Sequence, residues 1–325
     1  MMDPNQSCPD VLSKVPNDVI DEILMHLPFR DAVCTSILSK EWRKHWCRLP
    51  QLTFDSDFWK LKKDIQCLTC DKRATKDLTS NFTTTIHNII ARHSGPVTKC
   101  TLCIQYWKIY PPIDNLLYFL SRNRIQHLVL RLPRQLKLPP SFFTCLNLRH
   151  MFLQNCLLLP PPDFKGFDRL ISLELHEVIA KGQEIPKKLF FDLLCVKHLC
   201  MCIYLDRDEI LCPLSLIRSF PFLQYLEIQM EHNFKKNMSA LECLEVEAFP
   251  DVIFKHLREV KLIEANVSIR EMQLMKLLLA MSPVLVRMVI SPHRFLGKSA
   301  IVKTLAKLAE FECASPKAEI FLKLI

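Results

Sequence analysis

The spacing apolar-x-x-apolar-x-apolar recurs nine times between residues 97 and 290, and this repetition restricts the possible folds more than any other feature. Successive copies start 28, 23, 22, 26, 27, 18, 16 and 28 residues apart. The copies are Val97-x-x-Cys100-x-Leu102, Ile125-x-x-Leu128-x-Leu130, Leu148-x-x-Met151-x-Leu153, Leu170-x-x-Leu173-x-Leu175, Val196-x-x-Leu199-x-Met201, Leu223-x-x-Leu226-x-Ile228, Leu241-x-x-Leu244-x-Val246, Leu257-x-x-Val260-x-Leu262 and Leu285-x-x-Met288-x-Ile290. Because alternate residues of a strand point to the same side, each copy predicts one short strand with a buried face.

Such units cannot bury their apolar side alone, so consecutive strands are expected to stack in parallel into a solenoid. The expected return segments are Asp114–Phe119, Ser141–Cys145, Pro186–Phe191 and Pro213–Phe220. The spacing is irregular, and the Asn or Cys expected after the strand is clear only at Cys156, so a regular asparagine ladder is not expected. An unrelated α/β fold with parallel strands stays open as an alternative.

The N-terminal segment predicts three short helices. The first opens at Val15-Pro16-Asn17-Asp18, where proline suits the first turn and the acid complements the helix dipole. It carries an apolar stripe and ends at Leu27-Pro28, because proline disfavours helical geometry in the residue before it. The stripe consists of Ile20, Ile23, Leu24 and Leu27.

A second helix is expected from about residue 31 to 38, and Ser39 is a suitable N-cap for a third. That third helix would place Trp42 and Trp46 on one face. Three helices this short cannot bury all their apolar surface, so the stripe must pack on the next domain or receive a partner.

Residues 10–50 resemble the F-box, especially its plant form. The matching elements are Val15-Pro16-x-Asp18, Ile23-Leu24, Leu27-Pro28, Asp31-Ala32, Ser36-x-Leu38-Ser39 and Trp42-Arg43-x-x-Trp46, with Val15 in place of the usual leucine. The resemblance implies docking onto a Skp-type adaptor. The residues that it implies for this contact are Val15, Pro16, Ile20, Ile23, Leu24, Leu27 and Pro28. A three-helix cap on the following domain is the plainer alternative.

The connector is expected at residues 51–96. A short strand around Leu49–Asp55 leads out of the helices, an exposed loop is expected at Asp71–Asp77, and a helix follows from about Ser80 to His93. Gly95-Pro96 ends that helix as a glycine cap followed by a breaker.

The repeat region, residues 97–265, is similar to leucine-rich repeats, whose period is about 20–29 residues. Residues 266–325 resemble the FBD region that often closes plant F-box/leucine-rich-repeat proteins. There Ser268-x-x-Glu271 forms a capping box. The helix it opens has an apolar face of Leu274, Leu277, Leu278 and Met281 and ends at Ser282-Pro283. A helix near Ser299–Phe311 and a strand Ile320-x-Leu322-x-Leu324 are expected to cap the solenoid.

The predicted fold class is therefore α/β, with a three-helix F-box followed by an irregular leucine-rich-repeat solenoid that has one parallel strand per repeat.

The net charge of +9 is unevenly distributed. Positions 1–60 hold 7 basic and 9 acidic residues, which leaves 36 basic and 25 acidic residues beyond them. This excess is scattered and lacks the basic–aromatic interleaving of nucleic-acid binders, so an acidic protein partner accounts for it at least as well and nucleic acid is not expected.

The chain begins without a secretory signal and has no long uncharged apolar run, so no membrane partner is expected. Its 15 cysteines then indicate a reducing compartment, with an intracellular location in the nucleus, the cytoplasm or both.

No catalytic or metal-binding constellation stands out. Cys67-x-x-Cys70 and Cys100-x-x-Cys103 offer four thiols, but Cys100 occupies a core position of the first repeat, so packing is expected in place of zinc. The 4 glycines are isolated, which excludes glycine-rich phosphate loops. We expect neither an enzyme nor a cofactor.

The resemblance implies the substrate-recognition subunit of a Skp–cullin–F-box ubiquitin ligase. The F-box would bind the adaptor and, through it, the cullin, while the repeats would bind an unidentified protein substrate. A non-catalytic scaffold outside ubiquitination is the alternative, and a small molecule completing the substrate surface stays possible. The sequence does not identify substrate-binding residues.

Overall fold

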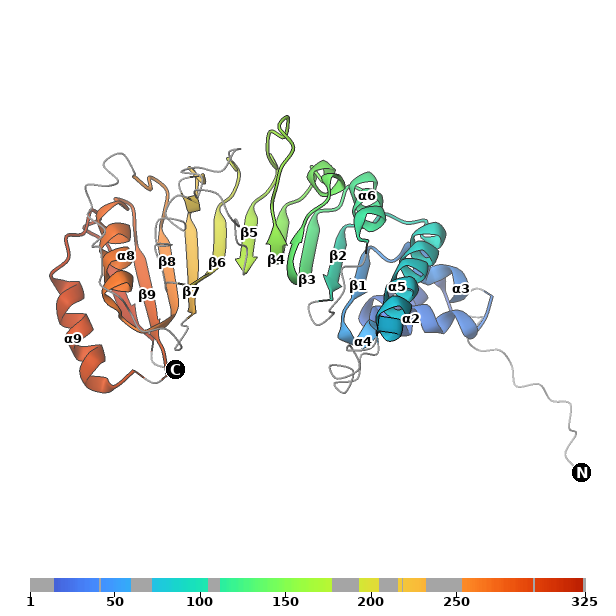
Figure 1. The fold of residues 1–325 in the computed structure, drawn as a ribbon, viewed down its shortest axis with the longest axis horizontal. Helices are drawn as coiled ribbons and strands as arrows, with labels where there is room; N and C mark the ends of the chain where they lie inside the picture. The colour runs from blue at the N-terminus through green and yellow to red at the C-terminus, as the bar shows by residue number, and fades with distance from the viewer. Residues whose placement is uncertain are drawn as a thin grey trace, which may run out of the picture. The chain divides into compact units, whose positions relative to one another are not determined.

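The computed structural model describes residues 15–40, 42–59, 72–104, 112–176, 193–204, 216–217, 219–231, 253–294 and 296–323. The chain, drawn as a ribbon in Figure 1, divides into two compact units, Met1–Leu148 and Arg149–Ile325. Helices and parallel strands occur in both units, as the predicted α/β class requires.

The first unit begins with the short helices expected from the sequence. They are α1 (Asn17–His26), α2 (Phe29–Cys34), the 3-10 turn η2 (Thr35–Ile37), α3 (Trp42–His45) and the 3-10 turn η3 (Trp46–Arg48). Ser39 Oγ accepts a hydrogen bond from Trp42 N–H at 3.3 Å, as expected of a residue that caps α3. Trp42 and Trp46 are both 4% exposed, so their shared face points into the core.

Aromatic rings join these helices to the elements that follow, which are β1 (Gln51–Phe54), α4 (Ser56–Trp59) and α5 (Lys72–Arg92). Phe29 of α2 packs edge-on against Phe54 of β1, with ring centroids 5.6 Å apart. Trp59 of α4 stacks on Phe82 of α5 at 5.3 Å. This chain of ring contacts makes the N-terminal helices part of the first unit's core.

The prediction of an exposed loop at Asp71–Asp77 is wrong, because α5 already begins at Lys72. Its 21 residues let the apolar residues Phe82, Ile86 and Ile89 bury one face, and the polar residues before Ser80 continue the same helix.

The strands of the first unit pair in parallel and in chain order. Leu52 of β1 lies opposite Cys100 of β2 (Lys99–Cys103), and Cys100 lies opposite Leu128 of β3 (His127–Lys137). The strand expected only to lead out of the helices is therefore the first of the sheet. The return segments of this unit are α6 (Asp114–Arg122) and the 3-10 helix η6 (Pro140–Thr144). They lie at the two places where the sequence predicted returns.

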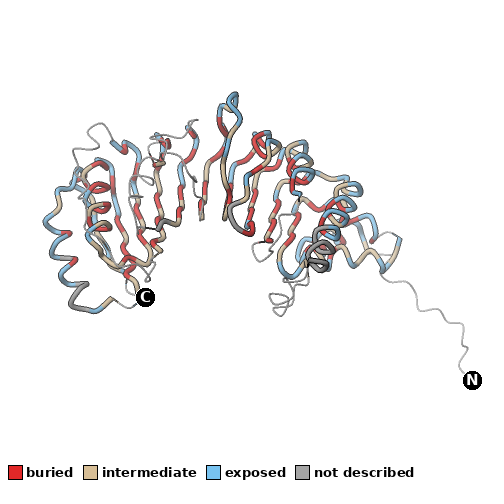
Figure 2. Tube along the Cα trace, in the orientation of Figure 1, coloured by how far each residue is buried: buried red, intermediate tan, exposed pale blue. Residues whose placement is uncertain are grey.

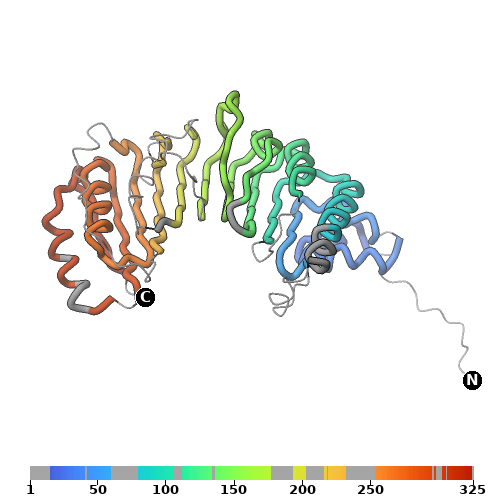
Figure 3. The backbone as a smooth tube through the Cα atoms, in the orientation of Figure 1, coloured from blue at the N-terminus to red at the C-terminus, as the bar shows by residue number. Residues whose placement is uncertain are grey.

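Within the second unit the strands also pair in parallel and in chain order. They are β4 (His150–Leu157), β5 (Ser172–His176), β6 (His198–Tyr204), β7 (Tyr225–Glu231), β8 (Glu259–Ala265), β9 (Arg287–Pro292) and β10 (Glu319–Leu322). Figure 3 shows the colour advancing from each of these strands to the next. This order confirms one parallel strand per repeat.

The apolar triads of the repeat form the core. In eight of the nine predicted copies all three positions are at most 5% exposed, and the copy at Leu241 lies outside the described residues. Buried and half-exposed residues alternate along these strands (Figure 2). The expected return at Pro186–Phe191 also lies outside the described residues, as does half of Pro213–Phe220.

The C-terminal elements follow the prediction closely. Ser268 Oγ accepts a hydrogen bond from Glu271 N–H while the Glu271 side chain accepts one from Ser268 N–H, so the capping box opens α8 (Ile269–Ala280). Helix α9 (Lys298–Ala309) precedes β10, which pairs with β9. Within the described part of the chain, no helix is both long and apolar enough to cross a membrane.

Candidate functional site

The apolar stripe of α1 divides into an inner and an outer row. Ile20 and Leu24 are each 1% exposed and belong to the core of the helices. Ile23 is 41% exposed and Leu27 is 36% exposed. Successive residues of a helix are separated by about 100°, so one apolar stripe in the sequence can contain residues that face the core and residues that face outward. On α1 only the outer row is available to a partner.

The remaining predicted contact residues lie at the ends of this helix. Pro16 and Pro28 are exposed, and Val15 is half-buried. The seven residues predicted for the adaptor contact therefore comprise two core residues and five that reach the surface to different extents.

Val19 extends the outer row by one helical turn, and three further apolar side chains outside the row are exposed. Val19 and Met25 on α1 are 44% and 51% exposed, while Ile37 and Leu38 beyond α2 are 85% and 47% exposed. We call Val19, Ile23, Met25, Leu27, Ile37 and Leu38 the outer apolar patch. Exposed apolar residues in this number on short, folded helices are typical of a protein-binding surface.

Sequence reasoning missed Val19, Met25 and Ile37 as candidate contact residues. The signal for Val19 was present, because it precedes Ile23 by four residues and so shares its helical face. Ile37 and Met25 carry no periodic signal, since one lies in a 3-10 turn and the other stands apart from the stripe.

A polar cluster fixes α1 against the third helix. His45 is 3% exposed, and its Nδ1 lies 2.7 Å from Asp21 Oδ1. Arg48 Nη2 lies 3.4 Å from the same oxygen and 2.8 Å from His45 Nδ1. Because a ring nitrogen that donates its proton to Asp21 cannot also accept one from Arg48, the carboxylate is the shared acceptor. The cluster holds the patch-bearing helix in a defined orientation.

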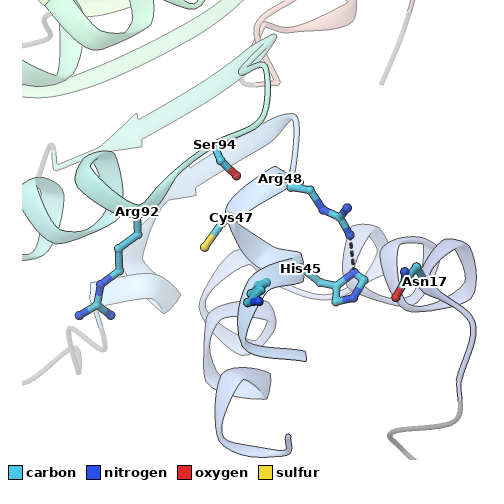
Figure 4. A pocket seen from close by; sticks show the side chains of 7 residues that line it. Asn17, His45, Cys47, Arg48, Arg92 and Ser94 are labelled. Carbon is cyan, nitrogen blue, oxygen red and sulfur yellow. Dashed lines mark hydrogen bonds between the residues drawn. The ribbon is translucent and has the colours of Figure 1, made fainter. Parts of the chain in front are cut away.

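A basic pocket of about 360 Å³ lies beside this cluster. Figure 4 shows its lining drawn from α1, α3, η3 and the end of α5. The lining residues are Asn17, Lys44, His45, Cys47, Arg48, Arg92 and Ser94. Lys44, Arg48 and Arg92 give the pocket a basic lining, in which Arg48 also lies beside the Asp21 carboxylate.

The wall of this pocket is held by backbone contacts between the end of α5 and η3. Ser94 N–H and Gly95 N–H both donate to Cys47 O, at 2.9 and 3.2 Å. His93 Nε2 lies 3.0 Å from Leu49 O, and burial lowers the pKa of His93, so the neutral ring is favoured. The connector helix and the N-terminal helices thus form one packed body.

Three of the ten described cysteines, Cys100, Cys145 and Cys156, are core residues, whereas the other seven are half-buried or exposed. Cys100 is fully buried in β2, and burial raises the pKa of its thiol, with the nearby Cys145 adding to the effect. Burial raises the pKa of Cys156 to about 12. Cys67 and Cys70 lie outside the described residues, so the four-thiol site considered from the sequence is not tested there. Elsewhere in the described chain, no cluster of three or more metal-ligating side chains occurs.

The half-exposed face of the second unit's strands carries a polar triad. Tyr225 Oη donates to Glu227 Oε2 at 2.5 Å, and Lys261 Nζ donates to the same oxygen at 2.8 Å. Burial alone would raise the pKa of Glu227, but the hydrogen bonds from Lys261 and Tyr225 and the charge of Lys261 outweigh it and hold that pKa below its ordinary value. The triad links neighbouring strands β7 and β8.

Comparison with known proteins agrees with this geometry. The sequence model of the F-box domain matches residues 12–53. An F-box/FBD/LRR-repeat protein of Arabidopsis thaliana is 36% identical over 178 residues, which cover 54% of this chain and 40% of that protein. Another F-box/FBD/LRR-repeat protein of the same plant is 27% identical over 181 residues, which cover 55% of this chain and 38% of that protein.

These matches confirm the resemblance on which the sequence analysis relied. The chain contains an F-box domain and is related to the plant F-box/FBD/leucine-rich-repeat proteins. It spans about two fifths of the length of the curated relatives that it matches.

Proposed function

We propose that this chain is the substrate-recognition subunit of a Skp–cullin–F-box ubiquitin ligase. The F-box helices bind a Skp-type adaptor, which connects them to the cullin, and the repeat strands hold the protein to be ubiquitinated. The outer apolar patch is the main support for this proposal. Its apolar side chains are exposed to water on the F-box helices, and burying them against a partner would be favourable.

The contact residues follow from exposure. Ile23 and Leu27 are the central anchors, with Pro16 and Pro28 at the two ends of α1 and Val15 at the margin. Ile20 and Leu24 support the surface from inside, because their burial keeps α1 against the other helices. In this proposal the adaptor contact depends on all seven residues, two of them through packing and five at the surface.

The proposed role requires no catalytic group in this chain. Ubiquitin transfer takes place on other subunits, and this subunit contributes by bringing substrate and donor close together, which replaces an encounter in solution by a local one. The protein would act inside the cell, in the nucleus or the cytoplasm.

The test is copurification with a recombinant Skp-type adaptor. Ile23→Asp should weaken adaptor binding at least about 30-fold, since a central interface anchor contributes about 2–4 kcal/mol and the new charge would be desolvated in the complex. Ile269→Asp is the matched control. Ile269 is 56% exposed at the first turn of α8, where an acid suits the helix dipole.

Failure of the wild-type chain to bind any Skp-type adaptor would contradict the proposal and favour a non-catalytic scaffold outside ubiquitination. Equal binding by the wild type and Ile23→Asp would show that the adaptor uses another surface.

A further inference from the structure

The exposed apolar residues of the second unit concentrate at one edge of its strands. Leu194, Phe222, Val284 and Val286 are 51%, 48%, 42% and 50% exposed. Each lies in the turn or at the residue just before a strand: Leu194 before β6, Phe222 before β7, and the two valines before β9. Because these strands are parallel and in register, their starting ends lie along the same edge.

Backbone hydrogen bonds align the residues of this edge strand by strand. Gln224 N–H donates to Lys197 O at 2.9 Å, Arg258 N–H donates to Gln224 O at 2.9 Å, and Val286 N–H donates to Arg258 O at 2.8 Å. Lys197, Gln224, Arg258 and Val286 therefore form one row. A second row runs through the turns, where the ring of Phe222 contacts that of His256 with centroids 5.2 Å apart.

The edge is also basic. Lys197 and Arg258 are exposed and occupy alternate positions of the first row, so with strands about 4.8 Å apart their backbones lie roughly 10 Å from each other. The neighbouring acids are Glu259 and Glu319, and both lie opposite Arg287, one on each side, in the register of β8, β9 and β10. Lys255, in the turn before β8, is a further exposed cation. Four cations (Lys197, Lys255, Arg258 and Arg287) thus stand against two carboxylates, and positive charge prevails along the edge.

The combination of exposed apolar side chains and cations along the edge restricts the kind of partner that can bind there. A nucleic acid would use the cations but would leave Leu194 and the two valines against phosphates and sugars. A purely apolar partner would bury Lys197 and Arg258 without compensation. A peptide that offers both apolar side chains and carboxylates satisfies both kinds of group.

We propose that this strand-start edge, centred on Leu194, Lys197, Phe222, Arg258, Val284 and Val286, docks an acidic amphipathic segment of a partner protein. The inference rests on the proposed function in that the partner would be the protein brought to the ligase. The crossing from β6 to β9 covers three strand spacings, about 14 Å, which an extended segment spans with four to five residues and a helix with about ten.

The direct test uses fluorescein-labelled peptides of 12 residues and the full purified chain, with binding followed by fluorescence anisotropy. One peptide alternates glutamate with leucine, and a second arranges the same residues with helical spacing. Two further peptides replace glutamate by lysine or leucine by serine. A glutamate–leucine peptide should bind at least about tenfold more tightly than both replacements, and binding should weaken as salt is raised because the charges are exposed.

Variants locate the binding site. The double variant Lys197→Glu/Arg258→Glu should lose at least about tenfold in affinity, and so should Phe222→Ser. The matched charge control is Lys303→Glu/Lys307→Glu on α9, and the matched apolar control is Leu159→Ser, all three being exposed positions that are not among the residues of the edge. The control variants should bind the peptide as the wild type does.

Three outcomes would overturn the inference. They are equal binding of the glutamate and lysine peptides, an edge variant that binds as tightly as its control, and preferential binding of a duplex DNA probe at the same edge. Adaptor copurification is measured separately on the same preparations. Adaptor binding without peptide binding rejects the docking edge alone, whereas peptide binding without adaptor binding rejects the proposed function and leaves the edge in place.

Discussion

At the scale of single residues, Gly95 shows how a missing side chain sets the geometry of the first unit. A Cβ atom added there would lie 2.8 Å from both the Cα and the carbonyl oxygen of Arg48. These are backbone atoms of η3, which cannot turn away as a flexible side chain could. The close approach lets Gly95 N–H reach Cys47 O and joins the end of α5 to the N-terminal helices.

Gly95→Ala should therefore lower the free energy of unfolding of the first unit by about 1–3 kcal/mol through overpacking. All four tryptophans of the chain precede residue 108, so urea unfolding followed by tryptophan fluorescence reports on this unit. Gly297→Ala is the control, because a Cβ there meets nothing within 4 Å. Because Gly297 lies in the second unit, Gly297→Ala should leave the tryptophan transition of the first unit nearly unchanged. Equal losses in the two variants would show that the contact with Arg48 relaxes freely.

Leu24 and Ile23 are adjacent residues with different expected roles. Leu24→Ala should destabilise the first unit by about 2–5 kcal/mol, because it leaves a cavity at a fully buried site. Ile23→Ala should change stability by less than about 0.5 kcal/mol, as is usual at exposed positions, while weakening adaptor binding. Urea unfolding and adaptor titration on both variants separate the two effects. A large stability loss from Ile23→Ala would place it in the core.

The sequence could not make this distinction for α1. Ile20, Ile23, Leu24 and Leu27 satisfy a single helical stripe, and the direction from which the other helices approach decides which of them become buried. That direction depends on tertiary contacts such as the one between Asp21 and His45. The F-box motif identified the binding helix, but the separation into core and surface required the packed structure.

At the scale of elements, the prediction was most successful where local chemistry dictates the outcome. Ser268 and Glu271 form the expected capping box because both hydrogen bonds join residues three apart. The expectation of a loop in the polar stretch before Ser80 was wrong. Polar composition does not distinguish a loop from a solvated helical turn that extends a well-packed helix.

The capping box gives a prediction for α8. Ser268→Ala removes the acceptor of Glu271 N–H and should destabilise the second unit by about 1 kcal/mol. Hydrogen–deuterium exchange should then speed up in the first turn of α8, while Ser268→Asp, which retains a capping oxygen, should restore protection. Unchanged exchange in Ser268→Ala would mean that tertiary packing alone fixes the start of the helix.

The triad on β7 and β8 gives a pH prediction. Because the folded pKa of Glu227 is lowered, its carboxylate stabilises the fold at a pH above the ordinary glutamate pKa of about 4.3, and this contribution is lost as the pH falls through the folded value. Glu227→Gln should lower Tm by about 2–4 °C at pH 7, where about 1 kcal/mol is at stake.

The difference in Tm between wild type and Glu227→Gln should then shrink steadily below about pH 4. Glu310→Gln at an exposed position is the control and should leave Tm nearly unchanged at every pH. A difference that persists undiminished at low pH would show that the triad acts through packing and not through the charge of Glu227.

At the scale of the whole molecule, the repeat determined the sheet correctly because its information is redundant. Three apolar positions recur in each copy, so irregular spacing in one place does not obscure the strand order. The same periodicity said nothing of the strand-start edge, since residues such as Phe222 and Arg258 lie between the core positions. Their alignment appears only once the register is known. Binding surfaces on a repeat protein are thus less readable than its core.

The last prediction concerns independence of the two proposed functions. If the outer apolar patch binds the adaptor and the strand-start edge binds the substrate, each should survive loss of the other. Ile23→Asp/Leu27→Asp should retain binding of the acidic peptide while adaptor binding is lost. Lys197→Glu/Arg258→Glu should retain the adaptor and lose the peptide, mainly through a slower association rate at low salt.

The decisive measurement is a reconstituted ubiquitination assay with adaptor, cullin and a carrier protein that displays the glutamate–leucine segment beside accessible lysines. The wild type should modify this carrier, and each double variant should reduce modification at least about tenfold, because proximity needs both contacts at once. Mixing the two variants should not restore activity, since each molecule lacks one contact. Efficient modification by either double variant, or by the mixture, would show that a single chain need not hold adaptor and substrate together, and a scaffold function would then describe the protein better.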